Sequence, residues 1–420
     1  MVIGQFSLGI KIVVLTREAA RMAAVMLALL VAGCGGGSGE VGENRQTVLL
    51  PVGNGVDTGG GANGPSNPPG QSEPPSDPPP SDNPPDTPPD TPPDNPPADP
   101  PPQVVPCPDP ARCLDLGRAT VAQYKGGKKA AASYTFDDGY ATSFAIADMF
   151  EARGLRASFY IVPSTVEDDG WASWQDLARR GHEVGNHSMT HTVDLGAATL
   201  TEAQLSAEIL EAQRRMAAKM GSKPEVFAFP WHSSTAAARA MALSTHLAIR
   251  TSTPELPFEL AFFDSDHGEP AVALRTVNEQ LQSTVSAGAW YVAAGHGVDG
   301  DGWSPVTSAF LKQHLDYAQG FGDKLWIDTF VNVARYRLCR KQAVLDIVST
   351  AHGKLQLQLK GEFAASCTAP LTVTLPTTVN GIPALLARDA SGAQVPLKPV
   401  KGQLAVDILP GQTVTLEAAP

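Results

Sequence analysis

Three short segments of the chain carry the side chains best suited to chemistry. Asp137 and Asp138 are adjacent carboxylates that follow an apolar run and precede a glycine. His187 and His191 are spaced i and i+4, so on a helical turn both imidazoles face the same way and can meet one metal ion. His296 ends a third segment, which is a run of apolar residues. One carboxylate and two histidines suit zinc or another divalent transition metal and leave coordination open for water and substrate.

The elements that must position these side chains lie between about residues 128 and 340, where short apolar runs alternate with helical patterns. The clearest helix is predicted over 200–220, with Thr199 and Glu202 as its capping box and Gly221 at its end. The alternation predicts a parallel sheet, open or closed as a barrel, with chemistry at the carboxyl ends of its strands. The predicted strands are 131–136, 157–162, 226–229, 247–250, 290–294 and 325–328.

The pattern changes after Cys339 to short, partly alternating apolar runs separated by Gly, Pro and Asn. This pattern is typical of a small β-sandwich, which we predict for residues 341–420. A role as a structural appendage is favoured over carbohydrate binding, because the region lacks exposed tryptophans for stacking on sugars. Its predicted strands are 355–359, 371–375, 384–386 and 414–417.

Residues 1–34 have the layout of a secretory signal, with arginines, a short apolar core and small residues. The small residues end at Cys34, as in a bacterial lipoprotein processing site, where the cysteine is acylated. A plain signal peptide with a chance cysteine is the alternative. Residues 35–106 are rich in glycine and then proline, which predicts an unfolded, semi-rigid spacer. The catalytic domain is expected over 107–340.

The chain has five cysteines, and lipidation of Cys34 would leave an even number in an oxidising compartment. Three pairings of the remaining four are possible, and the pairing of sequence neighbours joins Cys107 with Cys113 and Cys339 with Cys367. A zinc site is the other interpretation, but the spacing lacks the usual CxxC pairs. Disulfide bonds are favoured.

The charge of the chain excludes one class of function. The formal net charge is −12, whereas a nucleic-acid-binding protein needs a basic face to neutralise phosphates. A thioredoxin-like or nucleotide-binding protein is also disfavoured, because the sequence has no CxxC motif and no glycine fingerprint. We therefore expect no nucleic-acid partner.

At this point residues 128–340 resemble the NodB-type polysaccharide deacetylases, carbohydrate esterase family four. Three motifs carry the resemblance: residues 135–139 (TFDDG), residues 187–191 (HSMTH) and the strand that ends at His296. The family fold is a distorted, incomplete (β/α) barrel, so the resemblance implies that fold here. This agrees with the alternation of strands and helices.

The resemblance also implies a role for each candidate residue. Asp138, His187 and His191 match the metal ligands of the family, Asp137 matches the general base and His296 the general acid. The implied cofactor is a divalent metal, with zinc expected and cobalt or nickel as alternatives.

The third motif of the family is matched by residues 227–231 (FAFPW), which include Pro230. Its backbone N–H that stabilises the oxyanion would fall at Trp231. Tyr140 follows the first motif and, together with Trp303 and other aromatic residues near the site loops, could contact a sugar. Trp171 and Trp174 are the other aromatic candidates, although most tryptophans simply pack in cores.

The sequence departs from the family in two places. The third motif commonly carries an arginine that orients the base, but the aligned residue here is Ala228. The fourth motif, usually an aspartate that supports the acid histidine, has no match. Arg250, Asp264 and Asp266 are candidates to replace the missing partners, and His232 lies close enough to the third motif to reach the cleft.

The resemblance implies hydrolytic removal of acetyl groups from a polysaccharide, with an N-acetylated amino-sugar polymer as the first hypothesis. O-deacetylation, for instance of acetylated xylan, would use the same residues. A silent cell-wall-binding lipoprotein is the third hypothesis, but binding alone needs neither a base nor an acid. We expect a monomer that is lipid-anchored at the bacterial cell envelope. Gly35 after Cys34 favours the outer membrane over the inner one.

Overall fold

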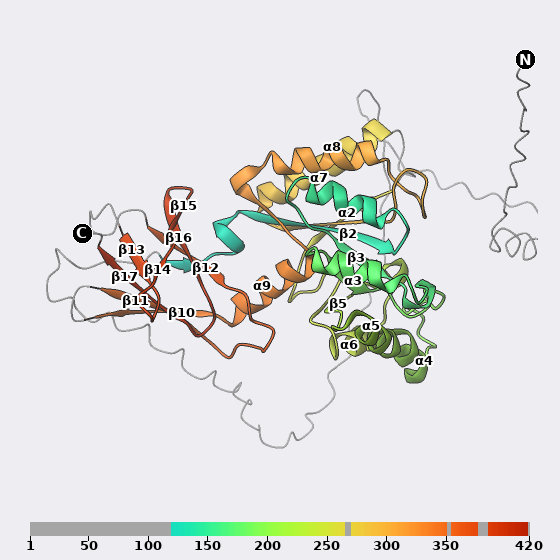
Figure 1. Cartoon of the computed structure of the whole chain (residues 1–420), viewed down its shortest axis with the longest axis horizontal. Helices are drawn as coiled ribbons and strands as arrows, with labels where there is room; N and C mark the ends of the chain where they lie inside the picture. The colour runs from blue at the N-terminus through green and yellow to red at the C-terminus, as the bar shows by residue number, and fades with distance from the viewer. Residues whose placement is uncertain (1–118, 265–269, 351–353, 377–384, 419–420) are drawn as a thin grey trace, which may run out of the picture. The chain divides into compact units, whose positions relative to one another are not determined.

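The computed structural model describes residues 119–264, 270–350, 354–376 and 385–418, which all belong to one compact unit, Thr91–Pro420 (Figure 1). The predicted signal segment, the spacer, Cys34, Cys107, Cys113 and Asp266 lie outside the described residues. No helix within the described ranges is long and apolar enough to cross a membrane.

A curled parallel sheet surrounded by helices forms the first part of the described chain (Figure 1). Its strands follow the order β6-β5-β4-β3-β2-β8-β7, and β9 pairs with the first residues of β2. The strands are β2 (Ala130–Asp138), β3 (Ser158–Ile161), β4 (Glu183–Asn186), β5 (Val226–Phe227), β6 (Ala248–Ile249), β7 (Glu259–Phe263), β8 (Trp290–Gly295) and β9 (Leu325–Ile327). All six predicted strands are present, and β4 and β7 are additional. The fold is the predicted distorted, incomplete (β/α) barrel.

Helices connect the parallel strands and cover the sheet. They are α2 (Ser143–Glu151), α3 (Trp171–Arg179), α4 (Glu202–Ser206), α5 (Ala212–Met220), α6 (Ala236–Leu243), α7 (Pro270–Ala287), α8 (Ser308–Gln319) and α9 (Phe330–Gln342). Single turns of other helix types are η1 (Lys125–Gly127), η2 (Pro163–Thr165), η3 (Ala207–Glu211, a π turn), η4 (Pro230–His232) and η5 (Gly322–Lys324).

The helix predicted over 200–220 is shorter and less regular than expected. It comprises α4, the π turn η3 and α5, and it ends at Gly221 with φ 74° as predicted. The predicted capping box of Thr199 and Glu202 is wrong. Thr201 is the N-cap, because its hydroxyl accepts from the backbone N–H of Gln204 while the Gln204 side chain accepts from the backbone N–H of Thr201.

The alternation of side chains along β2 separates the core from the site. Tyr134 and Phe136 point to the layer of helices, where Phe136 stacks on Phe159 with ring centroids 5.7 Å apart. Successive strand residues face opposite sides, so Thr135 and Asp137 point instead to the inner face of the curled sheet. The register of β2 therefore fixes which of the two adjacent aspartates enters the barrel interior.

An antiparallel β-sandwich follows the barrel. One sheet has the order β1-β12-β16-β15 and the other β10-β11-β17-β13-β14, and a shared apolar core that includes Leu357, Val373 and Leu416 lies between them. The strands are β1 (Thr120–Val121), β10 (Val344–Ser349), β11 (Leu355–Lys360), β12 (Leu371–Pro376), β13 (Leu385–Arg388), β14 (Gln394–Val395), β15 (Lys398–Val400), β16 (Gln403–Ile408) and β17 (Thr413–Ala418). Strand β1 comes from before the barrel, so the sandwich is not confined to residues 341–420.

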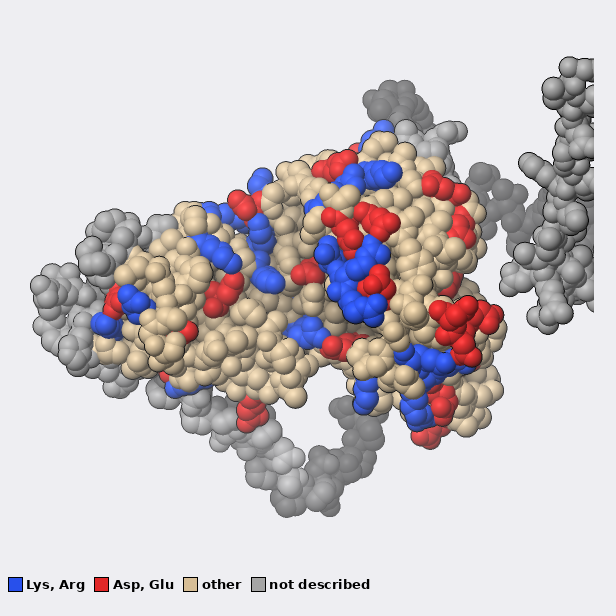
Figure 2. All heavy atoms as spheres, viewed as in Figure 1, with Lys and Arg blue, Asp and Glu red and all other residues tan. Residues whose placement is uncertain are grey.

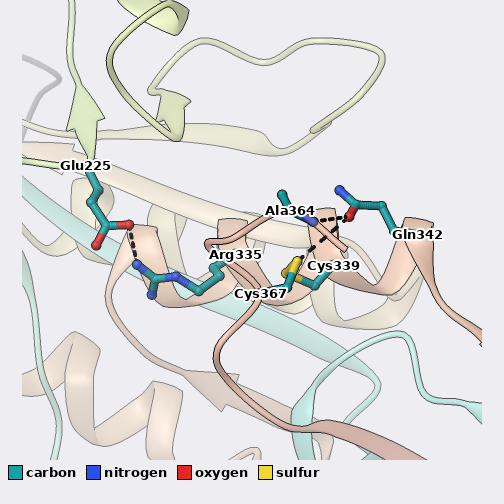
Figure 3. The surroundings of a disulfide bond; sticks show 6 residues. All are labelled: Glu225, Arg335, Cys339, Gln342, Ala364 and Cys367. Atoms are coloured by element: carbon teal, nitrogen blue, oxygen red, sulfur yellow. Dashed lines mark hydrogen bonds and ion pairs between the residues drawn. A yellow bond between two sulfur atoms is a disulfide. The ribbon is translucent and has the colours of Figure 1, made fainter. Parts of the chain in front are cut away.

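Helix α9 joins the sandwich to the barrel. The predicted disulfide between Cys339 on α9 and Cys367 is present and confirmed (Figure 3). Beside it, Gln342 accepts a hydrogen bond from the backbone N–H of Ala364 at 2.9 Å (Figure 3). The Tyr336 hydroxyl donates to the carbonyl of Ala122 at 2.9 Å. Covalent and polar contacts thus both fix this junction.

Charges of both signs intermingle on the surface shown in Figure 2. Arg180, at the end of α3, pairs with Glu151 of α2 at 2.8 Å, and Arg153 pairs with Asp316 at 2.7 Å. On this face, basic and acidic side chains lie close to one another.

Candidate metal centre and active site

The candidate site lies at the carboxyl ends of the parallel strands. Asp138 ends β2, His187 follows β4, Arg250 follows β6 and His296 follows β8. Residues from separate parts of the sequence meet there because the parallel strands end at one edge of the sheet. The sequence motifs indicated this edge, and the structure brings the five predicted ionisable residues together.

Asp138, His187 and His191 converge on one point. Oδ1 of Asp138 lies 3.5 Å from Nε2 of His187 and 3.4 Å from Nε2 of His191. Zinc bonds of 2.0–2.2 Å in a tetrahedral arrangement separate ligand atoms by about 3.3–3.5 Å. Oδ1 of Asp138 is also buried without a hydrogen-bond partner among the described residues. These three side chains therefore fit a divalent metal.

The protonation of His187 suits a metal ligand. Its Nδ1 donates to the carbonyl of Ala228 at 2.8 Å, which leaves the lone pair of Nε2 pointing to Asp138. Burial lowers the pKa of His187 despite the nearby carboxylate of Asp137, so the imidazole is neutral at neutral pH. Ala228, which stands where the family arginine is expected, thus supports a ligand through its backbone.

The loop that carries both histidines is not the helical turn expected from their spacing. Residues 187–192 form an irregular loop in which Ser188 and His191 have φ of 66° and 55°. The buried Glu208, on the π turn η3, holds this loop by accepting from the backbone N–H of Thr190 at 3.0 Å and from its hydroxyl at 2.8 Å. Glu208 was not among the candidates from the sequence. Its position on a π turn, an element that often marks functional sites, is visible only in the structure.

Strained backbone is concentrated at this site. The described residues include eight non-glycine residues with positive φ, and five of them are site residues. Left-handed conformations are unfavourable for side chains other than glycine and persist where the surrounding structure fixes them. The five are Asp138, Ser188, His191, Trp231 and His232.

Asp137 is held by Arg250, which lies 113 residues away along the chain. The guanidinium binds both carboxylate oxygens, at 2.6 and 2.5 Å, and also donates to the Thr135 hydroxyl at 2.8 Å. Its central carbon lies 5.1 Å from the centroid of the Tyr160 ring. Burial alone would raise the pKa of Asp137, but Arg250, His187 and His296 together outweigh burial and hold the pKa well below its ordinary value. Of the replacement partners proposed from sequence, Arg250 thus occupies the place beside Asp137.

His296 faces Asp138 from the opposite side, with Nε2 at 3.9 Å from Oδ2. Its Nδ1 is buried and has no hydrogen-bond partner among the described residues. Among the described residues, no carboxylate is hydrogen-bonded to this nitrogen, and the candidate Asp266 lies outside them. Asp264 is buried at the end of β7.

Tyr140 lies between Asp138 and the loop after β8. Burial raises its pKa to about 12, and the carboxylate of Asp138, to which its hydroxyl is hydrogen-bonded, adds to this effect. Its ring centroid lies 6.4 Å from that of His296. Tyr140 thus contacts Asp138 through its hydroxyl, which can orient that carboxylate, and lies beside His296 at the border of the site.

The third motif forms the turn η4 beside the histidine loop. Pro230 is buried, whereas Trp231 is 57% exposed and lies with its ring centroid 4.6 Å from that of His191. Burial lowers the pKa of His232 to about 4, and the Arg250 guanidinium adds to this effect. His232 thus lies within electrostatic reach of Arg250 and Asp137.

The aromatic candidates divide into two groups. Trp171 and Trp174 are buried in the core between the sheet and helices, so they cannot stack on a sugar. Trp303 is 58% exposed and its ring centroid lies 5.0 Å from that of His296. Phe262 on β7 was missed, although the apolar run 260–263 signals the strand; its ring lies 5.0 Å from that of His232. The other described histidines, His182, His246 and His314, are buried and belong to the core.

Comparison with known families agrees with this geometry. Residues 124–249 match the family model described as Polysaccharide deacetylase. This segment of the chain is thus similar to the polysaccharide deacetylases. The matched segment includes the three metal-ligand candidates, Asp137 and the turn η4, while Arg250 and His296 follow it.

Single proteins that resemble the chain share low sequence identity with it. A gellan lyase from Bacillus sp is 24% identical over 271 residues, which cover 58% of this chain and 11% of that protein, so the chain spans about a tenth of its length. Two solved structures cover about half of the chain. The Xyl-CE4 domain of a xylanase from the hindgut metagenome of Trinervitermes trinervoides is 17% identical, with a TM-score of 0.36, over 48% of this chain and 88% of its own. A family 4 acetyl xylan esterase from Clostridium thermocellum, in complex with cobalt, is 18% identical, with a TM-score of 0.35. The match covers 48% of this chain and 89% of that one.

Proposed function

We propose that the protein is a metal-dependent hydrolase that removes acetyl groups from the amino sugars of a polysaccharide. The observation that carries this proposal is the arrangement around Asp138. Three metal-ligand candidates meet there, with a carboxylate fixed by Arg250 on one side and His296 on the other. Binding of a glycan alone requires none of these ionisable groups.

A divalent cation, with zinc proposed first, would supply Lewis-acid chemistry that polarises the acetyl carbonyl and lowers the pKa of water. Asp138, His187 and His191 would hold it. Asp137 acts as the general base, because its carboxylate is ionised and Arg250 aims its oxygens at the interior of the barrel. Oδ2 of Asp137 lies 3.7 Å from Nε2 of His187, so the proposed base is next to one of the three metal-ligand candidates.

His296 acts as the general acid that donates a proton to the departing group. A departing amine or alkoxide leaves more readily when it is protonated, so His296 serves amide and ester hydrolysis alike, and amide hydrolysis is proposed first. The backbone N–H of Trp231 stabilises the developing oxyanion. Pro230 and Tyr140 border the substrate on the two sides of the metal centre.

We further propose that the chain is exported, acylated at Cys34 and held at the cell envelope, with the outer membrane favoured. Residues 35–106 would then act as a spacer between the lipid and the catalytic domain. A glycan of the envelope is the substrate class that this location offers.

The test is release of acetate by the purified chain after removal and restoration of zinc. Substrates are N-acetylglucosamine oligomers, peptidoglycan and acetylxylan, and the variants are Asp137→Asn and, as a matched control, the exposed Asp176→Asn. We expect metal-dependent release from an amino-sugar substrate, lost in Asp137→Asn and kept in Asp176→Asn. Release from acetylxylan alone would show that the activity is ester hydrolysis and not the proposed amide hydrolysis. No release from any substrate by folded, metal-bound protein would overturn the proposal.

A further inference from the structure

Exposed aromatic side chains surround the candidate site. Within the described ranges, six large apolar side chains are exposed, and three of them are aromatic. These three are Trp231, Phe262 and Trp303, at 57%, 49% and 58% exposure. Every one contacts a histidine of the site, and we call them the aromatic rim. The remaining three, Leu243, Val344 and Val348, are aliphatic.

The members of the aromatic rim approach the site from different directions. Trp231 contacts the ligand candidate His191, and Trp303 contacts the acid candidate His296 on the other side of Asp138. Both contacts are T-shaped, with interplanar angles of 68° and 73°, and both indole side chains remain more than half exposed. Two wide apolar surfaces thus remain open to solvent beside the metal centre.

The exposure of Trp303 is not due to a loosely attached loop. The backbone N–H of Thr142 donates to Asp301 at 2.8 Å, and the backbone N–H of Val298 donates to the Thr142 hydroxyl at 3.1 Å. Asp299 accepts from the backbone N–H of Ser308 at 2.7 Å. The loop is therefore fixed to Thr142, after β2, and to the first residue of α8.

Close packing adds to these hydrogen bonds. Gly302 has φ 92°, and a Cβ there would lie 2.6 Å from the ring of Tyr140. The fold thus permits only glycine beside Trp303 and presses the loop against Tyr140. A fixed backbone that presents an indole ring to solvent is typical of a binding surface.

We propose that the aromatic rim binds the pyranose rings of a glycan chain on both sides of the sugar that is deacetylated, with Trp303 as a specificity-determining residue. Pyranose rings have apolar C–H faces and polar edges, which suits stacking on an open indole ring. Two open rings on opposite sides of the metal centre fit a chain better than a single sugar. This inference rests on the proposed function and extends it by selecting oligomers over monosaccharides.

The experiment compares Trp303→Ala and Trp303→Phe with the wild type on N-acetylglucosamine oligomers of increasing length. For long oligomers we expect Trp303→Ala to raise KM about tenfold, equivalent to about 1.4 kcal/mol. We expect kcat to change by less than about twofold, as for a contact made equally in the ground and transition states. Trp303→Phe should restore most of the loss. Leu243→Ala is the matched control, an exposed apolar residue at the end of α6, and should leave both constants unchanged.

A second readout separates failure of the aromatic rim from failure of the proposed function. Calorimetric titration of the metal-free chain with a long oligomer measures binding without turnover. Weaker binding by Trp303→Ala supports the aromatic rim even if the wild type releases no acetate. Equal binding by Trp303→Ala and wild type, or a loss of kcat with unchanged KM, would overturn this inference while leaving the deacetylase proposal intact.

Discussion

At the residue scale, the three metal-ligand candidates could be predicted from the sequence. Arg250, the ion-pair partner of Asp137, could be named only as one of several candidates. Asp138, His187 and His191 lie in two short motifs, each of which is recognisable from a few neighbouring residues. The ion pair of Asp137 with Arg250 joins β2 to β6 across the inside of the curled sheet. Local spacing contains no information on that contact, so the sequence offered Arg250 only as one of three candidates. For the second expected support, Nδ1 of His296 has no hydrogen-bond partner among the described residues.

Replacing Arg250 with methionine should destabilise the fold by about 3–5 kcal/mol, because it would leave the carboxylate of Asp137 buried and unpaired. Chemical denaturation measures this change. The double variant Arg250→Met/Asp137→Asn should recover most of the loss, since the uncompensated charge is removed.

The surface pair of Arg153 with Asp316 provides the comparison for this ion pair. Arg153→Met should cost less than about 1 kcal/mol, because the aspartate remains solvated. Equal costs for Arg153→Met and Arg250→Met would contradict the importance assigned to burial.

At the element scale, long apolar strands were easier to predict than short or polar ones. β2 and β8 are buried apolar runs, whereas β4 has the sequence Glu-Val-Gly-Asn and contains a buried carboxylate. The histidine loop was misassigned because i, i+4 spacing also occurs in an irregular loop with left-handed residues. The N-cap was misplaced by two residues, since several threonines precede the helix and only the structure shows which one bonds to the backbone.

The corrected N-cap can be tested with two neighbouring threonines. Thr201→Ala should lower the free energy of unfolding by about 1 kcal/mol, because the helix loses its capping box. Thr199→Ala, at the position suggested by the sequence, should have no measurable effect. Destabilisation by Thr199→Ala alone would restore the original assignment.

The start of α9 introduces a pH dependence of stability. Glu183 on β4 is buried, accepts from the backbone N–H of Val331 at 2.9 Å and from the Ser158 hydroxyl at 2.7 Å. Burial raises its pKa from 4.5 to about 7. The folded chain holds the Glu183 proton more tightly than the unfolded chain does. The contribution of this proton to the free energy of unfolding is therefore full below pH 4.5 and is lost as the pH rises through about 7.

Glu183→Gln should remove this part of the pH dependence. Between about pH 5 and pH 8, the wild type should lose up to roughly 3 kcal/mol more unfolding free energy than Glu183→Gln does. Denaturation at a series of pH values measures the difference, with the exposed Glu259→Gln as control. Parallel curves for wild type and Glu183→Gln would show that Glu183 does not titrate in this range.

At the scale of the whole molecule, the barrel and the sandwich are joined through α9 and the strand β1. Composition and alternation predicted both regions, and the Cys339–Cys367 pairing was among the three open pairings. The pairing of β1 with β12 joins residues more than 250 positions apart, so no local pattern could assign Thr120 to the sandwich.

Loss of the disulfide should weaken this junction. A closed segment with a sequence separation of 28 residues should contribute about 3–4 kcal/mol in the chain-entropy account. Cys339→Ser/Cys367→Ser should therefore unfold at lower temperature than the oxidised wild type in calorimetry. The reduced wild type should match this variant. Identical unfolding temperatures for all three proteins would show that the bond does not stabilise the junction.

The central claim is that Asp138, His187 and His191 hold a divalent metal that deacetylation requires. The most direct measurement titrates zinc into the metal-free chain while acetate release from N-acetylglucosamine oligomers is followed. Release should start near zero, rise with added zinc and level off at one equivalent, and His187→Ala should show no such rise. Full release before any metal is added, or an unchanged titration curve for His187→Ala, would contradict the account.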